Sequence, residues 1–202
     1  MIDAAKIDFS KLNGLIPAVV IDSFTDQVLM LGFMNKESFQ KTLDTNRVTF
    51  FSRTRNTMWT KGETSGNYLD LVDIKLDCDS DSIIVYANPA GNTCHTGDYS
   101  CFGIQKNNAR FLEYLFKFIQ QRKIELPEGS YTTKLFKENP DRIIQKVGEE
   151  AVETVVAAKN RDKNEILNEV SDLIYHLFVM LAEQNITLDE IGQTLKSRHI
   201  KK

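Results

Sequence analysis

Short apolar runs, separated by breaks rich in Gly, Asn and Asp, characterise the first half of the chain. Runs of this length, with β-branched and aromatic residues, are typical of strands. Five strands are therefore expected, at residues 15–21, 28–33, 48–52, 68–76 and 82–87. Between the second and third strands, Asn35 is a suitable cap for a helix that reaches about Thr45 and directs Phe39 and Leu43 inward.

After residue 108 the apolar positions recur at helical spacing. Four helices are expected, one from Phe111 to before Pro127, two at about 140–159 and 164–184, and a short one opened by the capping-box pair Thr187 and Glu190. The pattern thus predicts two domains. Residues 1–108 are expected to form an α+β, β-rich domain, and residues 109–202 an all-α domain.

Composition narrows the class of protein. Hydrophobic residues are 42% and charged residues 26% of the 202 positions, and the net charge is −3. This balance argues against a nucleic-acid partner, which usually requires a basic excess. The longest apolar runs, Leu15–Ile21 and Leu173–Ala182, are too short to cross a membrane, and the first residues carry no apolar segment of a secretion signal. A cytoplasmic enzyme without a membrane partner is expected.

The three cysteines, Cys78, Cys94 and Cys101, indicate metal or thiol chemistry, because an odd number does not suit a disulfide framework. Three thiolates would hold Zn²⁺ and leave one coordination position open, as in catalytic sites. The alternative is three ordinary buried cysteines. His95, beside Cys94, is a candidate for a ligand, a proton carrier or a hydrogen-bonded structural residue.

An acidic ladder precedes the last expected strand. If this segment is extended, Asp77, Asp79 and Asp81 point to one side, where they would repel one another unless a hard cation such as Mg²⁺ lay between them. An EF-hand is excluded, because Ser82 and Asn88 stand where that loop requires Gly and Glu. The alternative is a solvated turn.

A basic segment suits an anionic ligand. Arg53 and Arg55 alternate, so an extended backbone would direct both toward one phosphate, and the Gly-containing stretch 61–66 would add backbone N–H donors. The alternative is a pair of surface arginines.

Taken together, these motifs resemble phosphoribosyl-AMP cyclohydrolase over residues 14–105. The motifs are Ser52-Arg-Thr-Arg55 with Trp59-x-Lys-Gly-Glu-Thr-Ser-Gly66, Asp77-Cys-Asp-Ser-Asp81, and Cys94-His-Thr-Gly with Ser-Cys-Phe102.

The resemblance implies a homodimer with cyclohydrolase sites at the subunit interface. Zinc would be held by Cys78 of one chain with Cys94 and Cys101 of the other, and Mg²⁺ by the three aspartates. Zinc hydroxide would attack C6 of the adenine ring, with His95 transferring protons. The candidate substrate-binding residues are Ser52, Arg53, Arg55, Trp59, Lys61, Gly62, Glu63, Ser65 and Gly66.

The first long helix of the second half carries acids opposite an expected apolar face. Its acids are Glu149, Glu150 and Glu153; its expected apolar face comprises Ile143, Ile144, Val147, Ala151, Val155 and Ala158. On the next helix Glu169 and Asp172 lie one turn apart among apolar residues. Antiparallel packing of the two helices would gather four or five carboxylates around Mg²⁺. His176 is read as a structural histidine.

Residues 109–200 resemble phosphoribosyl-ATP pyrophosphohydrolase, an all-α, MazG-like hydrolase. The motifs are Ser130-Tyr-Thr-x-Lys-Leu-Phe136, Lys146-Val-Gly-Glu-Glu-Ala-Val-Glu153 and Asp172-Leu-Ile-Tyr-His176. The resemblance implies Mg²⁺-assisted attack of water on the triphosphate, with Glu153 catalytic and Lys134 and Lys146 on phosphates. It leaves open whether Glu149 or Glu150 ligates the metal directly.

The sequence is therefore interpreted as a bifunctional hydrolase of histidine biosynthesis acting on small nucleotides. The second domain would convert phosphoribosyl-ATP to phosphoribosyl-AMP and pyrophosphate, and the first would open the adenine ring. Three alternatives stay open: a single active domain, an RNA- or nucleotide-binding regulator using Arg53, Arg55 and Trp59, and a pyrophosphatase for other nucleotides.

Overall fold

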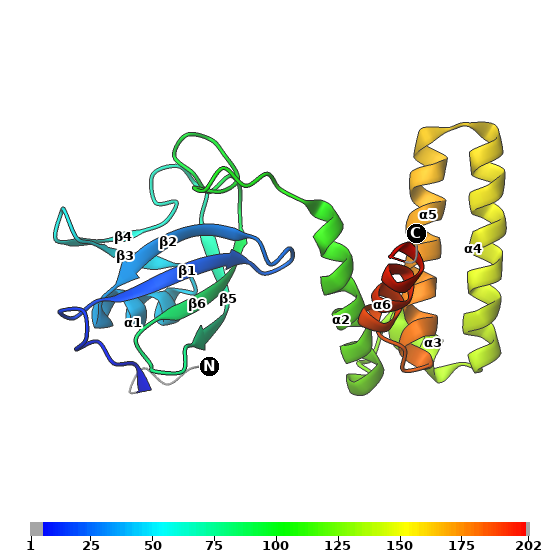
Figure 1. Cartoon of the computed structure of the whole chain (residues 1–202), viewed down its shortest axis with the longest axis horizontal. Coiled ribbons are helices and arrows are strands. Elements are labelled where there is room, and N and C mark those ends of the chain that lie inside the picture. Colours follow the sequence, from blue (N-terminus) through cyan, green and yellow to red (C-terminus); the bar gives the residue numbers. More distant parts are fainter. Residues whose placement is uncertain (1–5, 201–202) are drawn as a thin grey trace. The chain divides into compact units, whose positions relative to one another are not determined.

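A computed structural model describes residues 6–200 (Figure 1). The chain divides into two compact units between Phe111 and Leu112, slightly after the expected boundary at residue 108. The first unit is β-rich and the second is helical, which confirms the predicted fold class.

A four-stranded sheet forms the framework of the first unit. Its order is β2-β1-β6-β5, with strands β1 (Ile16–Asp22), β2 (Val28–Met34), β5 (Leu69–Leu76) and β6 (Ile83–Pro89). The β1–β6 pair is parallel, whereas β1–β2 and β5–β6 are antiparallel. Because β1 and β6 run side by side in the same direction, the segment that enters β1 lies beside the turn that enters β6.

Strand β1 shows why these residues form a half-buried strand. Every second side chain is buried, beginning with Ile16 and ending with Asp22, and the intervening ones are partly exposed. This is the two-residue period of a pleated strand. Helix α1 (Lys36–Thr45) begins as expected at Asn35, which forms a capping box with Ser38.

A separate two-stranded ribbon carries part of the candidate site. It comprises β3 (Thr49–Ser52) and β4 (Thr57–Thr60). Strand β4 is absent from the sequence-based prediction, because four largely exposed residues give too little alternation to reveal a strand. Phe50 of β3 is fully buried and stacks on Trp59 of β4, with ring centroids 5.0 Å apart.

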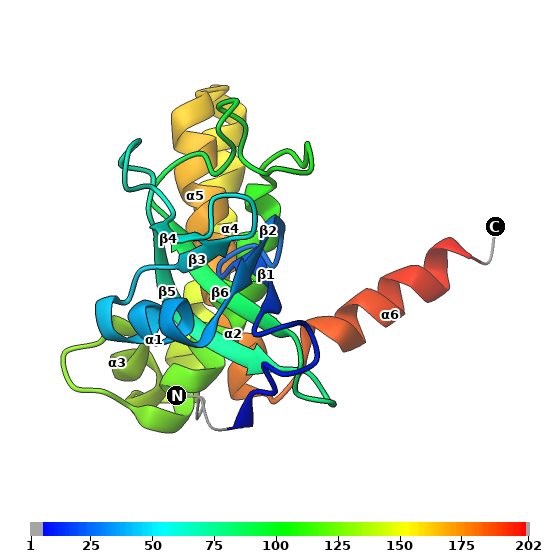
Figure 2. The same cartoon turned by 90° about the vertical axis from the view of Figure 1, so that its left-hand side faces the viewer.

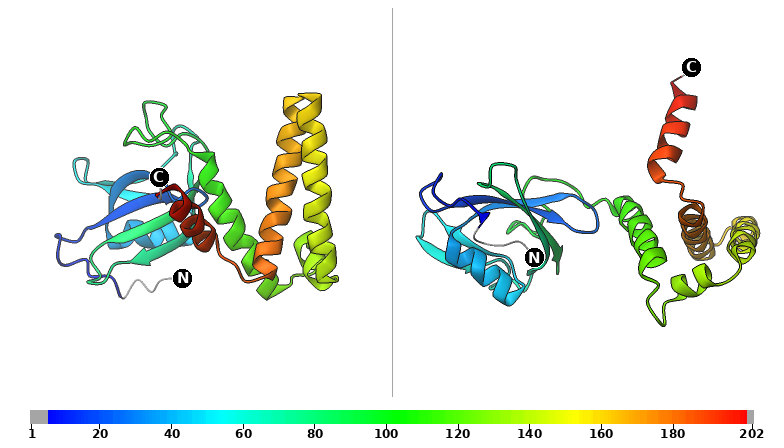
Figure 3. Two further views of the ribbon diagram at one scale, coloured as in Figure 1. Left: turned by 45° about the vertical axis from the view of Figure 1, so that its right-hand side comes forward. Right: turned by 90° about the horizontal axis from the view of Figure 1, so that it is seen from below.

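The second unit consists of helices, which begin after the short 3₁₀ turn η2 (Asn108–Arg110). They are α2 (Phe111–Glu125), α3 (Tyr131–Lys137), α4 (Pro140–Asn160), α5 (Lys163–Glu183) and α6 (Leu188–His199). Helices α4 and α5 lie side by side as a long hairpin (Figures 1 and 3). Helix α6 extends away from this hairpin and has no buried residue (Figure 2). The sequence-based prediction misses α3, whose seven residues are too few for a clear helical period.

The expected apolar face of α4 is wrong in part. The structure buries Ile143, Glu150 and Ala157, while the side chains of Ile144 and Val155 are mostly exposed. Glu150 is buried because it joins acids of α5, so the packed side of α4 is mixed and part of its apolar side stays uncovered. Within residues 6–200, no helix combines the length and apolar character that crossing a membrane requires.

Candidate functional sites

A cavity of about 510 Å³ in the first unit gathers many of the predicted residues. Its lining comprises Arg55, Trp59, Thr60, Lys61, Gly62, Glu63, Thr64, Ser65, Asn67, Cys94, His95 and Gly97. Gly62, in the loop that lines this cavity, adopts a positive φ of 91°. A Cβ at this position would lie 2.5 Å from the backbone of Asn67, so the close approach of the two segments requires glycine. Gly66 closes the loop through its N–H, which donates to the carbonyl of Gly62 at 2.8 Å. The cavity thus combines cations, hydroxyls and a thiol.

The loop that carries Cys94 and Cys101 is anchored to the sheet on both sides of Ser100. The buried Tyr99 hydroxyl donates to Asp22 at 2.6 Å, and the Ser100 hydroxyl donates to the Val28 carbonyl at 2.8 Å. The backbone N–H of Cys101 donates to the Leu29 carbonyl at 2.8 Å. These bonds place both thiols on one rigid loop.

The two thiols of this loop differ in acidity. The Thr96 hydroxyl lies 3.0 Å from the Cys94 sulfur, and this hydrogen bond lowers the pKa of the Cys94 thiol. Partial desolvation of the sulfur, followed by interaction with Cys94, raises the pKa of the Cys101 thiol. His95 is exposed, with Nδ1 3.8 Å from the Cys94 sulfur. The pair of free sulfurs, one favoured as thiolate, suits Zn²⁺.

Cys78 lies on a different element, the turn between β5 and β6, where it is exposed. Among the described residues of a single chain, no group of three possible metal ligands includes a cysteine. The Cys94–Cys101 loop supplies two thiols. A three-thiolate zinc site therefore requires a third thiol from outside this loop.

The acidic ladder is a turn, so the expectation of an extended segment is wrong. Asp77 directly follows β5. One of its oxygens accepts from the backbone N–H groups of Asp81 and Ser82 at 3.0 and 3.2 Å, and the other accepts a short hydrogen bond from the Ser82 hydroxyl. Ser80 takes a positive φ of 66°. The turn, rather than strand alternation, brings together Asp77, Asp79 and Asp81, whose ligand oxygens lie within 4.8 Å of one another.

These hydrogen bonds, the Ser82 hydroxyl first, lower the pKa of Asp77 to about 2. An all-oxygen donor set of this kind suits a hard cation such as Mg²⁺.

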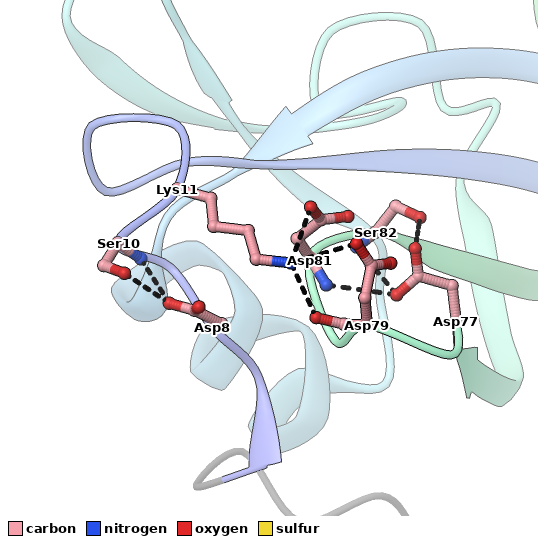
Figure 4. Close-up of polar contacts among 7 residues, drawn as sticks. All are labelled: Asp8, Ser10, Lys11, Asp77, Asp79, Asp81 and Ser82. Atoms are coloured by element: carbon pink, nitrogen blue, oxygen red, sulfur yellow. Dashed lines mark hydrogen bonds and ion pairs between the residues drawn. The ribbon is translucent and has the colours of Figure 1, made fainter.

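Lys11, which the sequence did not single out, reaches this turn from the segment before β1. Its ammonium lies 3.0 Å from Asp79 Oδ2 and 3.1 Å from Asp81 Oδ2 (Figure 4). No local pattern reveals this pairing, because 68 positions separate Lys11 from Asp79.

The two arginines of the basic segment do not converge. Residues 53–56 form a turn, and the Arg53 guanidinium stacks over the Phe33 ring at 3.7 Å. Arg55 lines the Cys94 cavity, whereas Arg53 is not part of that lining. An extended backbone was expected, and the turn sends the side chains in different directions. Ser52 lines a neighbouring cavity of about 380 Å³ that also includes Arg55 and Trp59.

In the helical unit, Glu150 of α4 meets Glu169 and Asp172 of α5, with ligand oxygens within 4.8 Å. Glu150 is only 5% exposed. Desolvation, followed by the charges of Glu153, Asp172 and Glu150, raises the pKa of Glu169. A site where neighbouring acids disfavour the ionisation of Glu169 is suited to a divalent cation, which would relieve the repulsion.

The neighbouring acids are placed differently. Glu149 forms ion pairs with Arg142 and Lys146, both at 3.0 Å, and lies outside the cluster. Glu153 is exposed, yet close enough for its charge to act on Glu169. Lys146 also contacts Glu150 at 3.1 Å, and its pKa is raised by hydrogen bonds to Glu149 and Glu150.

Behind this cluster, His176 is buried, as expected for a structural histidine. Its Nδ1 donates to the Asp172 carbonyl at 2.9 Å and lies 3.7 Å from Glu150 Oε1, and its Nε2 lies 3.2 Å from the Tyr131 hydroxyl. Tyr131 was not predicted as a site residue. It lines a cavity of about 520 Å³ together with Lys134 and Lys137, and its hydroxyl contacts His176.

Comparisons with known proteins divide the chain into the same two parts as the structure. Residues 30–103 match the family model for phosphoribosyl-AMP cyclohydrolase, and residues 112–199 match that for phosphoribosyl-ATP pyrophosphohydrolase. The chain is 50% identical over 196 residues to the histidine biosynthesis bifunctional protein HisIE of Bacteroides thetaiotaomicron, covering 96% of both chains. It is 49% identical over 194 residues to the protein of that name from Escherichia coli K12, again covering 96% of both. The corresponding Bacillus subtilis protein is 46% identical over 205 residues, covering 98% of both.

Proposed function

Because this chain belongs to the family of bifunctional histidine biosynthesis proteins, which combine a phosphoribosyl-AMP cyclohydrolase with a phosphoribosyl-ATP pyrophosphohydrolase, we propose which of its residues carry each reaction. The observation that carries the proposal is that two chemically different candidate sites lie in two separate units. One holds thiols beside a cavity, and the other is lined by carboxylates.

The helical unit hydrolyses phosphoribosyl-ATP to phosphoribosyl-AMP and pyrophosphate. Glu150, Glu169 and Asp172 are the proposed ligands of Mg²⁺, which supplies charge neutralisation for the triphosphate. Glu153, exposed beside Glu169, is the proposed residue for orienting the attacking water. Lys134 and Lys146 are the proposed phosphate contacts. Glu149 contributes by holding Arg142 and Lys146 in place.

The first unit opens the adenine ring of phosphoribosyl-AMP. Zinc held by Cys94, Cys101 and a Cys78 would act as a Lewis acid and make water nucleophilic toward C6 near neutral pH. Arg55, Lys61 and the loop containing Gly62 and Ser65 line the cavity in which the phosphate and ribose would bind. His95, exposed at the cavity and next to Cys94, is the proposed proton carrier.

We further propose that the zinc site is shared by two chains of a homodimer. The support is the position of Cys78 on a turn apart from the Cys94–Cys101 loop, together with its exposure. The aspartates next to Cys78 would then hold Mg²⁺ close to the same site.

Each reaction is tested in the full chain by assaying both steps separately. Cys94→Ser is expected to abolish ring opening, lower the zinc content from about one per chain and leave pyrophosphate release intact. Glu169→Gln is expected to reduce pyrophosphate release by at least about a hundredfold and leave ring opening intact. Glu113→Gln, an exposed change on α2, is the matched control and should affect neither step. Loss of both activities in either site variant, with unchanged thermal unfolding, would contradict two independent sites.

A further inference from the structure

We propose that Lys11 is a resident counter-cation of the Asp77–Asp79–Asp81 cluster and that its ammonium must leave before a divalent cation binds there. The inference rests on the proposed metal role of this cluster. It concerns a residue of the segment before β1 that neither the motifs nor the family resemblance singles out.

The contacts of Lys11 satisfy its ammonium completely. The three acceptors are Asp79 Oδ2 at 3.0 Å, Asp81 Oδ2 at 3.1 Å and the backbone carbonyl of Asp79 at 2.9 Å (Figure 4). An ammonium has three N–H donors, so each donor has a partner. Two of the acceptors are oxygens of Asp79 and Asp81, two of the three carboxylates that could ligate a metal ion at the cluster.

The ammonium and a metal ion compete for these carboxylates. Mg²⁺ binds its ligands at about 2.1 Å in a near-octahedral arrangement, and so has to approach Asp79 and Asp81 more closely than the lysine nitrogen does. Two cations that compete for one pair of carboxylate oxygens also repel each other. Binding of the metal ion is therefore an exchange for Lys11.

The charges favour replacement of the Lys11 ammonium by a divalent cation. Lys11 compensates one of three clustered negative charges, whereas a divalent cation compensates two. The Lys11 and Asp79 side chains are 39% and 62% exposed, and ion pairs of such exposure contribute little in water. The ion pairs therefore keep the Lys11 ammonium at the cluster but are weak enough for a divalent cation to displace it.

A backbone bond keeps the displaced lysine nearby. The N–H of Asp8 donates to the Ser80 carbonyl at 2.7 Å, which docks the segment on the same turn independently of the Lys11 side chain. Release of the ammonium therefore leaves it tethered at a high local concentration, so it returns when the metal ion dissociates. Lys11 sets the concentration of divalent cation at which the cluster becomes occupied.

The test is a titration of the full chain with Mn²⁺ at constant low ionic strength. Electron paramagnetic resonance measures the concentration of free Mn²⁺ at each point of the titration. All chains carry Glu169→Gln and Asp172→Asn, which removes the helical cluster from the measurement. Lys11→Met is expected to bind Mn²⁺ roughly two- to fivefold more tightly than the parent. Lys41→Met, an exposed lysine on α1, is the matched control for loss of one positive charge and should leave the affinity unchanged.

Two further chains identify the cause. Lys11→Arg retains the positive charge and is expected to keep the weaker affinity of the parent. In a chain with Asp79→Asn and Asp81→Asn, Lys11→Met should have no effect, because no oxygens remain to compete for. Circular dichroism melts in excess chelator confirm that each variant is folded.

Equal or weaker Mn²⁺ binding by Lys11→Met would overturn the exchange, as would Lys11→Arg behaving like Lys11→Met. Failure of the underlying metal assignment has a different signature. In that case Asp79→Asn with Asp81→Asn leaves Mn²⁺ binding unchanged even when Lys11 is intact.

Discussion

Hydrogen bonds from nearby residues set the acidity of two candidate metal ligands in the first unit, Asp77 and Cys94. The Ser82 hydroxyl and two backbone N–H groups stabilise the ionised form of Asp77, and a Thr96 hydroxyl does the same for the Cys94 thiolate. Each donor lies within five positions of its acceptor, so a tight turn or loop is enough to create the effect. In both acceptors these donors favour the ionised form, which is the form that binds a metal ion.

Removing the Ser82 hydroxyl is expected to raise the pKa of Asp77 from about 2 toward the ordinary value of 3.8. In the parent, the folded-state pKa lies below the unfolded one. The ionised carboxylate therefore stabilises the fold above about pH 4, and this stabilisation is lost as the pH falls through about 2. The measurement is carboxyl NMR titration of Ser82→Ala in chelator. An unchanged titration of Asp77 would show that the backbone donors alone hold its pKa down.

At the scale of elements, the sheet determines where the cysteine loop can lie. Asp22 continues the buried side of β1, and Tyr99 reaches it from the loop that carries both thiols. Thr25 donates to the same Tyr99 hydroxyl at 3.0 Å. This buried network joins β1, its following turn and the loop, so the geometry of the candidate zinc ligands depends on a bond that Tyr99, two residues before Cys101, makes to the sheet.

Tyr99→Phe is expected to destabilise the chain by about 1–3 kcal/mol, because it leaves the 1%-exposed Asp22 without one of its donors. The loop should also hold zinc more weakly. Thermal or urea unfolding measures the first effect and competition with a chromogenic chelator the second. Tyr86→Phe, a partly exposed tyrosine on β6, serves as the matched control. Unfolding that matches the parent would mean that water replaces the lost donor at Asp22.

In the whole molecule, each of the two units carries its own candidate site, whereas the proposed zinc site takes its ligands from two chains. Cys78 and the Cys94–Cys101 loop belong to different elements, and the described residues of one chain do not gather them into a ligand group. A site assembled between chains makes activity depend on which thiols each partner contributes.

Co-expression of Cys78→Ser with Cys94→Ser chains tests this arrangement. Each variant alone is expected to lack ring opening, but the mixed dimer regenerates one complete site, which corresponds to about one quarter of the parent activity for random pairing. Cys94→Ser with Cys101→Ser is the matched control. Both changes affect the same loop, so their mixture should stay inactive. Equal activities of the two mixtures would argue against a shared site.

Local patterns were sufficient for most of the architecture. The apolar run at residues 15–21 and the helical spacing at about 164–184 depend only on nearby residues, and the structure confirms both elements, as Ile16–Asp22 and Lys163–Glu183. The motif around Cys94 likewise lies within one loop. Thr57–Thr60 and Tyr131–Lys137 were missed because elements this short contain barely one period of any pattern.

Local sequence patterns thus account for the two-domain organisation, most elements and the residue types at each site. Which of these residues meet depends on how the elements pack. The parallel pairing of β1 with β6 brings Lys11 to the aspartate turn, and the packing of α4 on α5 selects Glu150 rather than Glu149 for the carboxylate cluster. The physical reason is range: backbone preferences act over a few neighbouring residues, whereas contacts between distant residues depend on how whole elements bury their surfaces against one another.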